Sequence, residues 1–593
     1  MGGDGLWVAG RTFAEPPAPE RPRLPVIPIV FLPGIMGSNL RVKPARIAEV
    51  RRRFEEEGRG REFRAQAWAP PSVRHSLLRT AGSVLLELVG GNCRAVRTAR
   101  AWKQLGPKLR QVLLNPETVE VDPNGFLPGF IPHLPIMDGK PGPAAARARG
   151  WGQVHWESYQ PILQYLERNL NPRWAEERAS TSAWEQKLGL IGAILKSFLG
   201  PDAEPVVPGA EELGRVVRSR YPVHAVGYNW TQSNLHSAED VLAGIRNILQ
   251  GYRGQGETCR QVILVTHSMG GLVARVVSQL AAEAGEPDLV LGVVHGVMPA
   301  IGAPVAYRRM VAGTEAERLV WLKELRGAFP TIAGRTAAET TPVMANAPGA
   351  LELLPSHLYP PGWLKVERPA GAEGVQTVFT LPERDPYQEI YRQRNTWWRM
   401  VDPGLLDPAQ IGGWTAEGYH PELAWENFLK RMSEVEALHR TRLARHHYHS
   451  PSFYFYGEQE PTFGSVRWLL GPSAVDLREG EIRVSRPGPG DGKGSCELRA
   501  FPRGAPSGGR VGGEYDPGQE FRFHAELAPA DDLGDGTVPT ISGHAPASVI
   551  PYGVATDVQR FDHADAFKNL LSQMFTAMAI CKLAGAGAPG GQP

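Results

Sequence analysis

The sequence predicts an α/β protein with a mostly parallel central sheet, flanking helices and large insertions. Short β-branched runs alternate with segments of helical periodicity, as crossover connections between parallel strands require. The chain has 593 residues, more than a single hydrophobic core accommodates, so several packing units are expected. Its formal net charge of +2 argues against a dedicated nucleic-acid binder.

The first expected strand covers residues 26–32 and ends at Pro33-Gly34, as a buried strand entering a tight turn would. Further apolar runs of the same kind are expected to form the rest of the sheet. They lie at 223–226, 262–265, 289–294, 452–456 and 548–552. Helical patterns at 237–249 and 271–282 separate the middle runs, which predicts right-handed crossovers and parallel pairing.

The expected core is discontinuous, because the sheet-forming pieces are far apart in the sequence. It combines residues 27–45, 220–305, 450–462 and 528–585. The segments between them are expected to be a cap insertion at 46–219, a second cap or lid insertion at 306–449 and a β-hairpin-like insertion at 463–527. Such long insertions cost little, because loop-closure entropy grows only logarithmically with length. Residues 1–26 and 586–593 are expected to be tails.

Ser268 stands where an apolar strand passes into a helix through a turn of small residues. This strand–turn–helix context is typical of a nucleophile elbow, whose strained backbone exposes the serine hydroxyl near a helix N-terminus. The residues two before and two after the serine must be small. Gly270 meets this need, whereas Thr266 is larger than the usual glycine. A turn without a catalytic role is the alternative interpretation.

A serine nucleophile needs a base and an orienting acid, which follow it in this order: serine, acid, histidine. Asp535 has glycine on both sides, unlike the two aspartates just before it. The alternatives for it are a solvated turn or a cation-binding loop. His563 lies just before an apolar helical segment at 567–583, where a general base is expected. His544 follows Asp535 too closely to allow an intervening strand and is the weaker candidate.

Several landmarks in the right order resemble the lecithin:cholesterol acyltransferase-like branch of the α/β-hydrolases. They are Val30 to Leu40 (oxyanion loop), Gly227-Tyr228-Asn229-Trp230, Thr266 to Gly271 (elbow), Tyr456 to Thr462, Gly534 to Pro539 and the terminal His563. The large insertions match no part of that family. Asn229 replaces the family's aspartate, which puts a structural ion pair in doubt but not the candidate triad.

The resemblance implies an α/β-hydrolase fold and a role for each matched residue. Ser268 would attack the ester carbonyl, His563 would take and return the proton, and Asp535 would hold the imidazole. The backbone N–H groups of Ile35 and Met269 would bind the oxyanion, an effect of about 3 to 4 kcal/mol per donor. Neither a metal nor a cofactor is expected.

The expected activity is that of a lipase or phospholipase that cleaves fatty-acyl esters through an acyl-enzyme. Residues 184–199 form an apolar segment that fits an amphipathic lid helix resting on lipid, or equally a helix packed between cap and core. An acyltransferase with the same triad remains open, because only the accepting alcohol would differ. So does a non-catalytic α/β-hydrolase scaffold that binds a protein partner.

The N-terminus shows no readable signal peptide, and no stretch of 18 apolar residues occurs. The protein is therefore expected to be synthesised in the cytoplasm. It also resembles bacterial lipolytic toxins delivered by type VI secretion, which lack signal peptides and carry large inserts. That resemblance implies an antibacterial effector, signal-independent delivery and a partner immunity protein. An intracellular lipid or polyester esterase is the alternative.

Overall fold

The computed structural model describes residues 24–68, 105–129, 131, 142–171, 181–314, 334–370, 374–471, 482–485, 494–502, 510–511, 514–515, 521–557 and 560–586. The predicted tails at 1–26 and 586–593 lie almost entirely outside the described residues.

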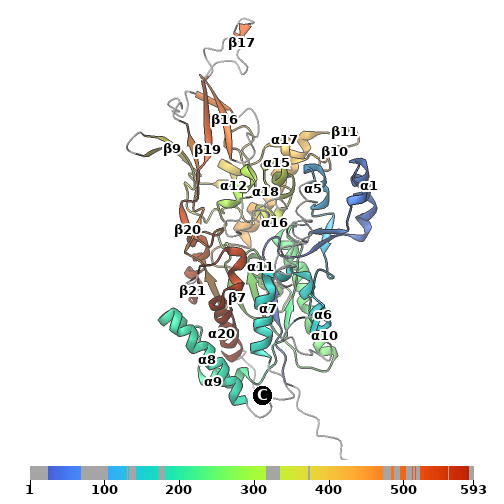
Figure 1. The fold of residues 1–593 in the computed structure, drawn as a ribbon, viewed down its shortest axis with the longest axis vertical. Coiled ribbons are helices and arrows are strands. Elements are labelled where there is room, and N and C mark those ends of the chain that lie inside the picture. The colour runs from blue at the N-terminus through green and yellow to red at the C-terminus, as the bar shows by residue number, and fades with distance from the viewer. Residues whose placement is uncertain are drawn as a thin grey trace, which may run out of the picture.

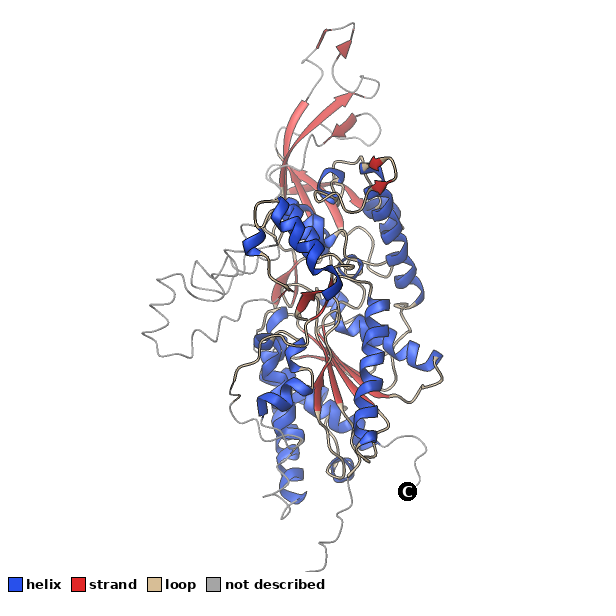
Figure 2. Cartoon of the chain, turned by 90° about the vertical axis from the view of Figure 1, so that its right-hand side faces the viewer, coloured by secondary structure: helices blue, strands red, loops and turns tan. Residues whose placement is uncertain are grey.

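The centre of the molecule is a six-stranded, wholly parallel sheet in the order β21-β12-β7-β6-β1-β5. Its strands are β1 (Ile29–Leu32), β5 (Val223–Ala225), β6 (Val262–His267), β7 (Val290–Gly296), β12 (Ser452–Tyr456) and β21 (Gly553–Ala555). Figure 2 shows helices on both sides of this sheet, which confirms the predicted fold class.

The last strand lies just after the predicted run at 548–552, which was wrong in position. Residues 545–548 form the 3₁₀ turn η8 (Ala545–Ser548), which contains Pro546, and the edge strand β21 begins at Gly553, two residues after Pro551. Proline fixes its own φ angle and lacks an N–H, so the two prolines favour a turn over a strand in this stretch.

Side chains of each central strand alternate between two apolar layers. In β1, Val30 and Leu32 pack in the layer of α10 (Asn234–Gly254) and α11 (Gly270–Glu283). Ile29 and Phe31 pack in the opposite layer, with α7 (Trp156–Leu170) and α20 (Leu570–Ala586). Both helices expected from the periodicity at 237–249 and 271–282 are confirmed as α10 and α11.

The segment 46–219 is not one cap. Its described helices and strands besides α7 are α1 (Ile47–Glu56), β3 (Gln66–Trp68), α5 (Pro107–Leu113), β4 (Val119–Val121), α6 (Gly142–Ala148), α8 (Thr181–Leu199) and α9 (Ala210–Val216). Helices α8 and α9 pack with α20 in an apolar layer of the central sheet. Strands β3 and β4 flank β2 (Leu40–Val42) in a small antiparallel sheet. Helix α7, by contrast, packs on the central sheet through Ile162, Leu163 and Leu166.

The two later insertions share a second six-stranded sheet, seen above the first in Figure 1. Its order is β15 (Ile482–Ser485), β16 (Ser495–Pro502), β19 (Phe521–Leu527), β14 (Val466–Leu470), β8 (Leu364–Pro369) and β9 (Val375–Leu381). The β-hairpin expected in 463–527 is not a single hairpin, because β16 pairs with both β15 and β19. The parallel pair β14–β8 joins the two insertions.

The other described parts of the segment 306–449 are mainly helical and lie above the central sheet in Figure 1. Their elements are α12 (Val305–Ala312), α15 (Ala337–Met344), α16 (Pro348–Leu351), the π-helical turn η6 (Tyr387–Tyr391), α17 (Pro403–Leu406), the pair β10 (Trp414–Thr415) and β11 (Gly418–Tyr419), and α18 (Pro421–Thr441). The shorter elements elsewhere are β13 (Glu460–Thr462) paired with β20 (Asp532–Gly534), β17 (Arg510–Val511) paired with β18 (Glu514–Tyr515), α19 (Thr540–Gly543) and η9 (His563–Lys568).

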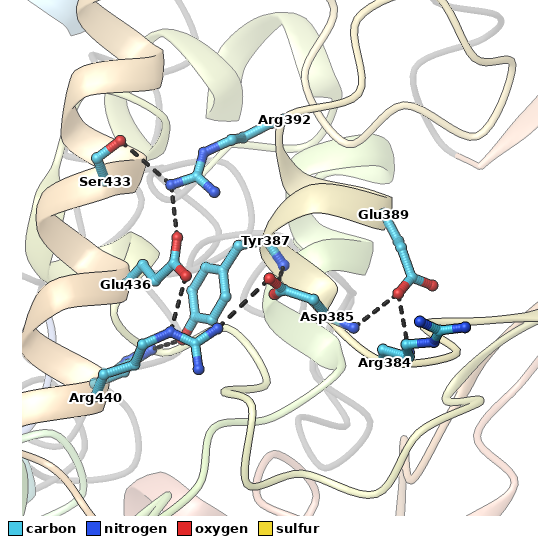
Figure 3. Close-up of polar contacts among 9 residues, drawn as sticks. Arg384, Asp385, Tyr387, Glu389, Arg392, Ser433, Glu436 and Arg440 are labelled. Carbon is cyan, nitrogen blue, oxygen red and sulfur yellow. Dashed lines mark hydrogen bonds and ion pairs between the residues drawn. The ribbon is translucent and has the colours of Figure 1, made fainter.

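Ion pairs attach η6 to α18 (Figure 3). The Glu436 carboxylate accepts hydrogen bonds from Arg392 at 2.7 Å and Arg440 at 2.8 Å. Arg440 also lies 3.5 Å from Asp385, whose other oxygen accepts from the N–H of Tyr387. A single partly exposed ion pair of this kind contributes little to the free energy of folding. The network therefore mainly fixes the orientation of η6 relative to α18.

Glu352 is a buried carboxyl group at the start of α10, where it accepts hydrogen bonds from the Ser233 hydroxyl at 2.7 Å and the Asn234 N–H at 2.8 Å. Burial raises its pKa to about 8. Between the unfolded value of about 4.3 and this one, the folded protein binds more protons than the unfolded chain. The free energy of unfolding should therefore fall as pH rises from about 5 to about 8.

Replacing this carboxyl by an amide should remove that contribution. We expect Glu352→Gln to flatten the fall in unfolding free energy between about pH 5 and about pH 8, measured by urea denaturation at several pH values. Glu417→Gln is the matched control, because Glu417 is exposed and its substitution should leave the slope unchanged. An identical slope in Glu352→Gln and the parent would contradict the expectation.

Candidate active site

Ser268 occupies a sharp bend between the end of β6 at His267 and the start of α11 at Gly270. Its φ angle of 52° lies in the left-handed region, which is strained for any residue but glycine. A β-carbon added at Gly270 would lie 2.5 Å from the carbonyl oxygen of Pro33, so only glycine fits there. The larger Thr266 is accommodated because its hydroxyl turns to a buried contact, 3.3 Å from His295 Nδ1.

The three side chains expected to form a triad lie in one hydrogen-bonded row. His563 Nε2 is 2.8 Å from Ser268 Oγ, and His563 Nδ1 is 2.7 Å from Asp535 Oδ2. The His563 N–H also donates to the carbonyl oxygen of Asp535 at 2.8 Å, which fixes the loop that carries the imidazole. In this geometry the imidazole can take a proton from the hydroxyl while the carboxylate holds its far side.

Local geometry explains why glycines flank Asp535. Gly536 has a φ of +87°, and a β-carbon at Gly534 would lie 2.2 Å from the carbonyl oxygen of Val538. The resulting turn lets Asp535 Oδ1 accept the N–H groups of Thr537 at 3.1 Å and Val538 at 2.7 Å, which leaves Oδ2 for His563. The carboxylate is therefore held rigidly.

The competing candidates have other neighbours. Asp531 accepts hydrogen bonds from the backbone N–H and the hydroxyl of Ser465. The His544 ring lies against the rings of Tyr456 and Tyr454, with centroids 5.3 and 6.4 Å away.

The loop 33–37 lies directly against the serine, since a β-carbon at Gly34 would be 2.9 Å from Ser268 Cβ. Gly37 N–H donates to the Gly34 carbonyl at 3.0 Å, and the Tyr228 hydroxyl donates to the Pro33 carbonyl at 2.7 Å. Within the described part of the chain, neither Ile35 N–H nor Met269 N–H donates to another protein group. Ile35 follows Gly34, which lies against Ser268, and Met269 follows Ser268 itself, so the N–H groups of both expected donors are close to the serine in the chain and free of a protein acceptor.

Two buried residues at this site were not assigned a role from the sequence: Tyr159 of α7 and His267 of β6. The Tyr159 hydroxyl accepts the Gly34 N–H at 3.0 Å and lies 3.1 Å from His267 Nδ1. His267 Nε2 lies 2.9 Å from the carbonyl oxygen of His563. Tyr159 carries no sequence signal, because it falls inside the unmatched segment 46–219. His267 could have been noted because it precedes the serine.

Asn229, which replaces the aspartate of the resembled family, makes neutral hydrogen bonds. Its side-chain amide donates to the carbonyls of Pro116 and Val119, and its oxygen accepts from Thr231. Among the described residues, no group of three or more His, Cys, Asp or Glu side chains is placed to hold a metal ion. No helix in the described ranges combines the length and hydropathy needed to cross a membrane.

Comparisons with known proteins agree with this architecture. Residues 231–318, which include Ser268, match the family model described as a PGAP1-like alpha/beta domain. The crystal structure of the Tle4–Tli4 complex contains a chain that aligns with a TM-score of 0.65 and 26% identity, over 94% of this chain and 98% of that one.

Phospholipase PlaB from Legionella pneumophila aligns at 10% identity and a TM-score of 0.13, over 56% of this chain and 85% of that chain. No curated protein matches. The expected α/β-hydrolase relationship is confirmed, although the family model that matches is PGAP1-like. The chain therefore has an α/β-hydrolase fold, and its residues 231–318 resemble the PGAP1-like α/β domain.

Proposed function

We propose that the protein is a serine carboxyl-ester hydrolase, a lipase or phospholipase that cleaves fatty-acyl esters through an acyl-enzyme on Ser268. The observation that carries this proposal is the row of hydrogen bonds from Ser268 Oγ through His563 to Asp535, at 2.8 and 2.7 Å. The row ends beside a loop with an available backbone N–H. Groups suited to act as nucleophile, base, orienting acid and oxyanion donors therefore lie close together, which supports the proposal.

Each group has one role in the proposed reaction. His563 Nε2 removes the proton as Ser268 Oγ attacks the ester carbonyl, and the N–H groups of Ile35 and Met269 stabilise the oxyanion. His563 then protonates the departing alcohol, which leaves the acyl group on Ser268. Water activated by the same imidazole releases the fatty acid. Asp535 holds the imidazole tautomer and steadies its positive charge in both steps.

The proposed biological role is that of an effector delivered by a signal-independent secretion system and neutralised by an immunity protein. The support is the full-length likeness to a chain that was solved in a complex, Tle4 with Tli4. The proposed partner is accordingly a protein that binds this chain tightly, and the proposed substrate is lipid of the target cell.

The function is tested by profiling lipids. Purified protein is incubated with vesicles of bacterial lipids, and the free fatty acids and lysolipids formed are measured by mass spectrometry. We expect the parent protein to release fatty acid and Ser268→Ala to release none. Transfer of the acyl chain to an added alcohol in place of water would show that the protein is an acyltransferase and not a hydrolase. No acyl release from any lipid class would contradict the proposal.

Helix α8 is the proposed contact with the lipid surface. It is apolar on two faces: Leu188, Ile191 and Leu195 are buried in the layer of α20, whereas Leu190 and Phe198 are 61% and 50% exposed. In Figure 1 the helix lies along the outside of the molecule beside α20. An exposed apolar helix face of this kind suits the headgroup region of a bilayer.

Charged residues on the outer face of α8 should weaken that contact. We expect the double substitution Leu190→Glu and Phe198→Glu to lower vesicle binding at least about tenfold, because burying each side chain in lipid contributes roughly 1.5 to 3 kcal/mol. Hydrolysis of a water-soluble short-chain ester should not change. Trp414→Glu is the matched control, since Trp414 is 61% exposed on β10. Equal co-sedimentation with vesicles would exclude α8 as the contact.

A further inference from the structure

We infer that Tyr159 and His267 are positioning residues that connect the oxyanion loop to the catalytic histidine through one buried chain of hydrogen bonds. The inference rests on the proposed function, because it assigns a task to groups that surround its nucleophile. The His267 ring lies beside the His563 ring, with centroids 5.1 Å apart, whereas the hydrogen bond of Ser268 Oγ goes to His563. One comes from α7, in the segment 46–219, and the other from the last position of β6.

The direction of each hydrogen bond in the chain is determined by its ends. Gly34 N–H can only donate, so the Tyr159 oxygen accepts it at 3.0 Å. The carbonyl oxygen of His563 can only accept, so the proton between it and His267 lies on Nε2, 2.9 Å away. His267 Nδ1 then carries a lone pair and accepts the Tyr159 hydroxyl proton at 3.1 Å. One arrangement of protons therefore satisfies the Gly34 N–H, the Tyr159 hydroxyl, the His267 imidazole and the His563 carbonyl.

That arrangement requires the imidazole of His267 to be neutral, and burial favours the neutral form. Both side chains lie in the protein interior, and desolvation lowers the pKa of His267 to about 3. Burial also raises the pKa of Tyr159, so its hydroxyl keeps the proton it donates. A charged His267 would carry a proton on Nδ1 and could no longer accept from Tyr159.

The oxyanion loop packs closely against these hydrogen-bonded side chains. A β-carbon at Gly37 would lie 2.4 Å from the Tyr159 hydroxyl oxygen, and one at Gly34 would lie 2.7 Å from His267 Nδ1. The Tyr159 ring is wedged between Phe31 and His267, with centroids 4.8 and 5.5 Å away. Glycine at both loop positions lets the backbone approach the chain this closely.

The consequence is that the oxyanion loop and the backbone of His563 are held by the same hydrogen-bonded pair, Tyr159 and His267. Fixing Gly34 N–H orients the peptide that follows, and with it the N–H of Ile35 that is proposed to bind the oxyanion. Fixing the carbonyl of His563 sets the position of the imidazole over Ser268. Small displacements of either group should lower kcat and leave substrate binding nearly unchanged, because the oxyanion exists only along the reaction path.

The test removes one hydroxyl and keeps the ring. We expect Tyr159→Phe to lower kcat on a soluble short-chain ester by about 10- to 100-fold, with KM within about threefold of the parent. Binding of a trifluoromethyl ketone, which forms an oxyanion on the serine, should weaken by a similar factor. Tyr165→Phe is the matched control, because Tyr165 lies half-buried on the same helix, and it should keep full activity.

The His267 end of the chain is tested separately. His267→Gln keeps an N–H donor for the His563 carbonyl and should retain more kcat than His267→Phe, which keeps none. An effect on the melting temperature with unchanged kcat in Tyr159→Phe and His267→Phe would overturn the inference, and so would a loss confined to KM. Failure of the proposed function is distinct, because the parent protein would then be no more active than Ser268→Ala.

Discussion

Replacing Ser268 by alanine is expected to lower the rate of acyl release by about 10⁶-fold, to the level that binding and the oxyanion donors alone sustain. The reason is that Ser268 Oγ is the hydroxyl hydrogen-bonded to His563 Nε2, and alanine has no atom that can bond to the acyl carbon. The rate is measured as fatty acid released per enzyme in a single turnover.

The alanine variant should remain folded. It keeps the β-carbon that packs against the loop at Gly34 and loses only one hydrogen bond, which changes stability by about 1 kcal/mol. Circular dichroism and the melting temperature of the same sample check this. A folded Ser268→Ala protein that releases acyl groups at the parent rate would place the nucleophile elsewhere.

The second large effect is expected for Asp535→Asn, a loss of about 10⁴-fold in kcat. The amide oxygen can keep the hydrogen bonds from Thr537 and Val538, so the amide nitrogen must face His563 Nδ1. An N–H donor at that position holds Nδ1 unprotonated and puts the proton on Nε2, where it blocks proton removal from Ser268. The shape of the site is preserved while the imidazole adopts the wrong tautomer.

Asp557→Asn is the matched control for this variant. Asp557 is a neighbouring buried carboxyl whose Oδ2 accepts the N–H groups of Glu458 and Gln459, bonds that an amide oxygen can keep. We expect kcat within a few-fold of the parent. Burst-phase kinetics on an activated ester separate acylation from deacylation for both variants. Equal losses in the two would mean that Asp535 acts only through the folding of its loop.

Much of the site could be predicted because its requirements are local in sequence. The bend at Ser268 needs a strand before it, a helix after it and Gly270 beside the Pro33 carbonyl, and all three appear within a dozen residues. The turn at Asp535 needs glycine on both sides for the same local reason. Periodicity likewise predicted α10 and α11, whose apolar stripes face the sheet.

The parts that could not be predicted depend on contacts between distant segments. Tyr159 meets Gly34 across more than a hundred residues, and nothing in the composition of α7 distinguishes it from any other buried tyrosine. The second sheet pairs β8 with β14 from separate insertions, so neither segment alone predicts the partner. The apolar side of α7 packs against β1 of the central sheet. The sequence of α7 alone does not indicate which strand it covers.

The claim on which the rest depends is that Ser268 is a nucleophile activated by His563. It is tested most directly by labelling with a fluorophosphonate and mapping the modified peptide by mass spectrometry. We expect one label on Ser268 in the parent protein, none in Ser268→Ala and a strongly slowed reaction in His563→Ala. Undiminished labelling of Ser268→Ala, or lipid hydrolysis by a parent protein that takes no label, would contradict the claim.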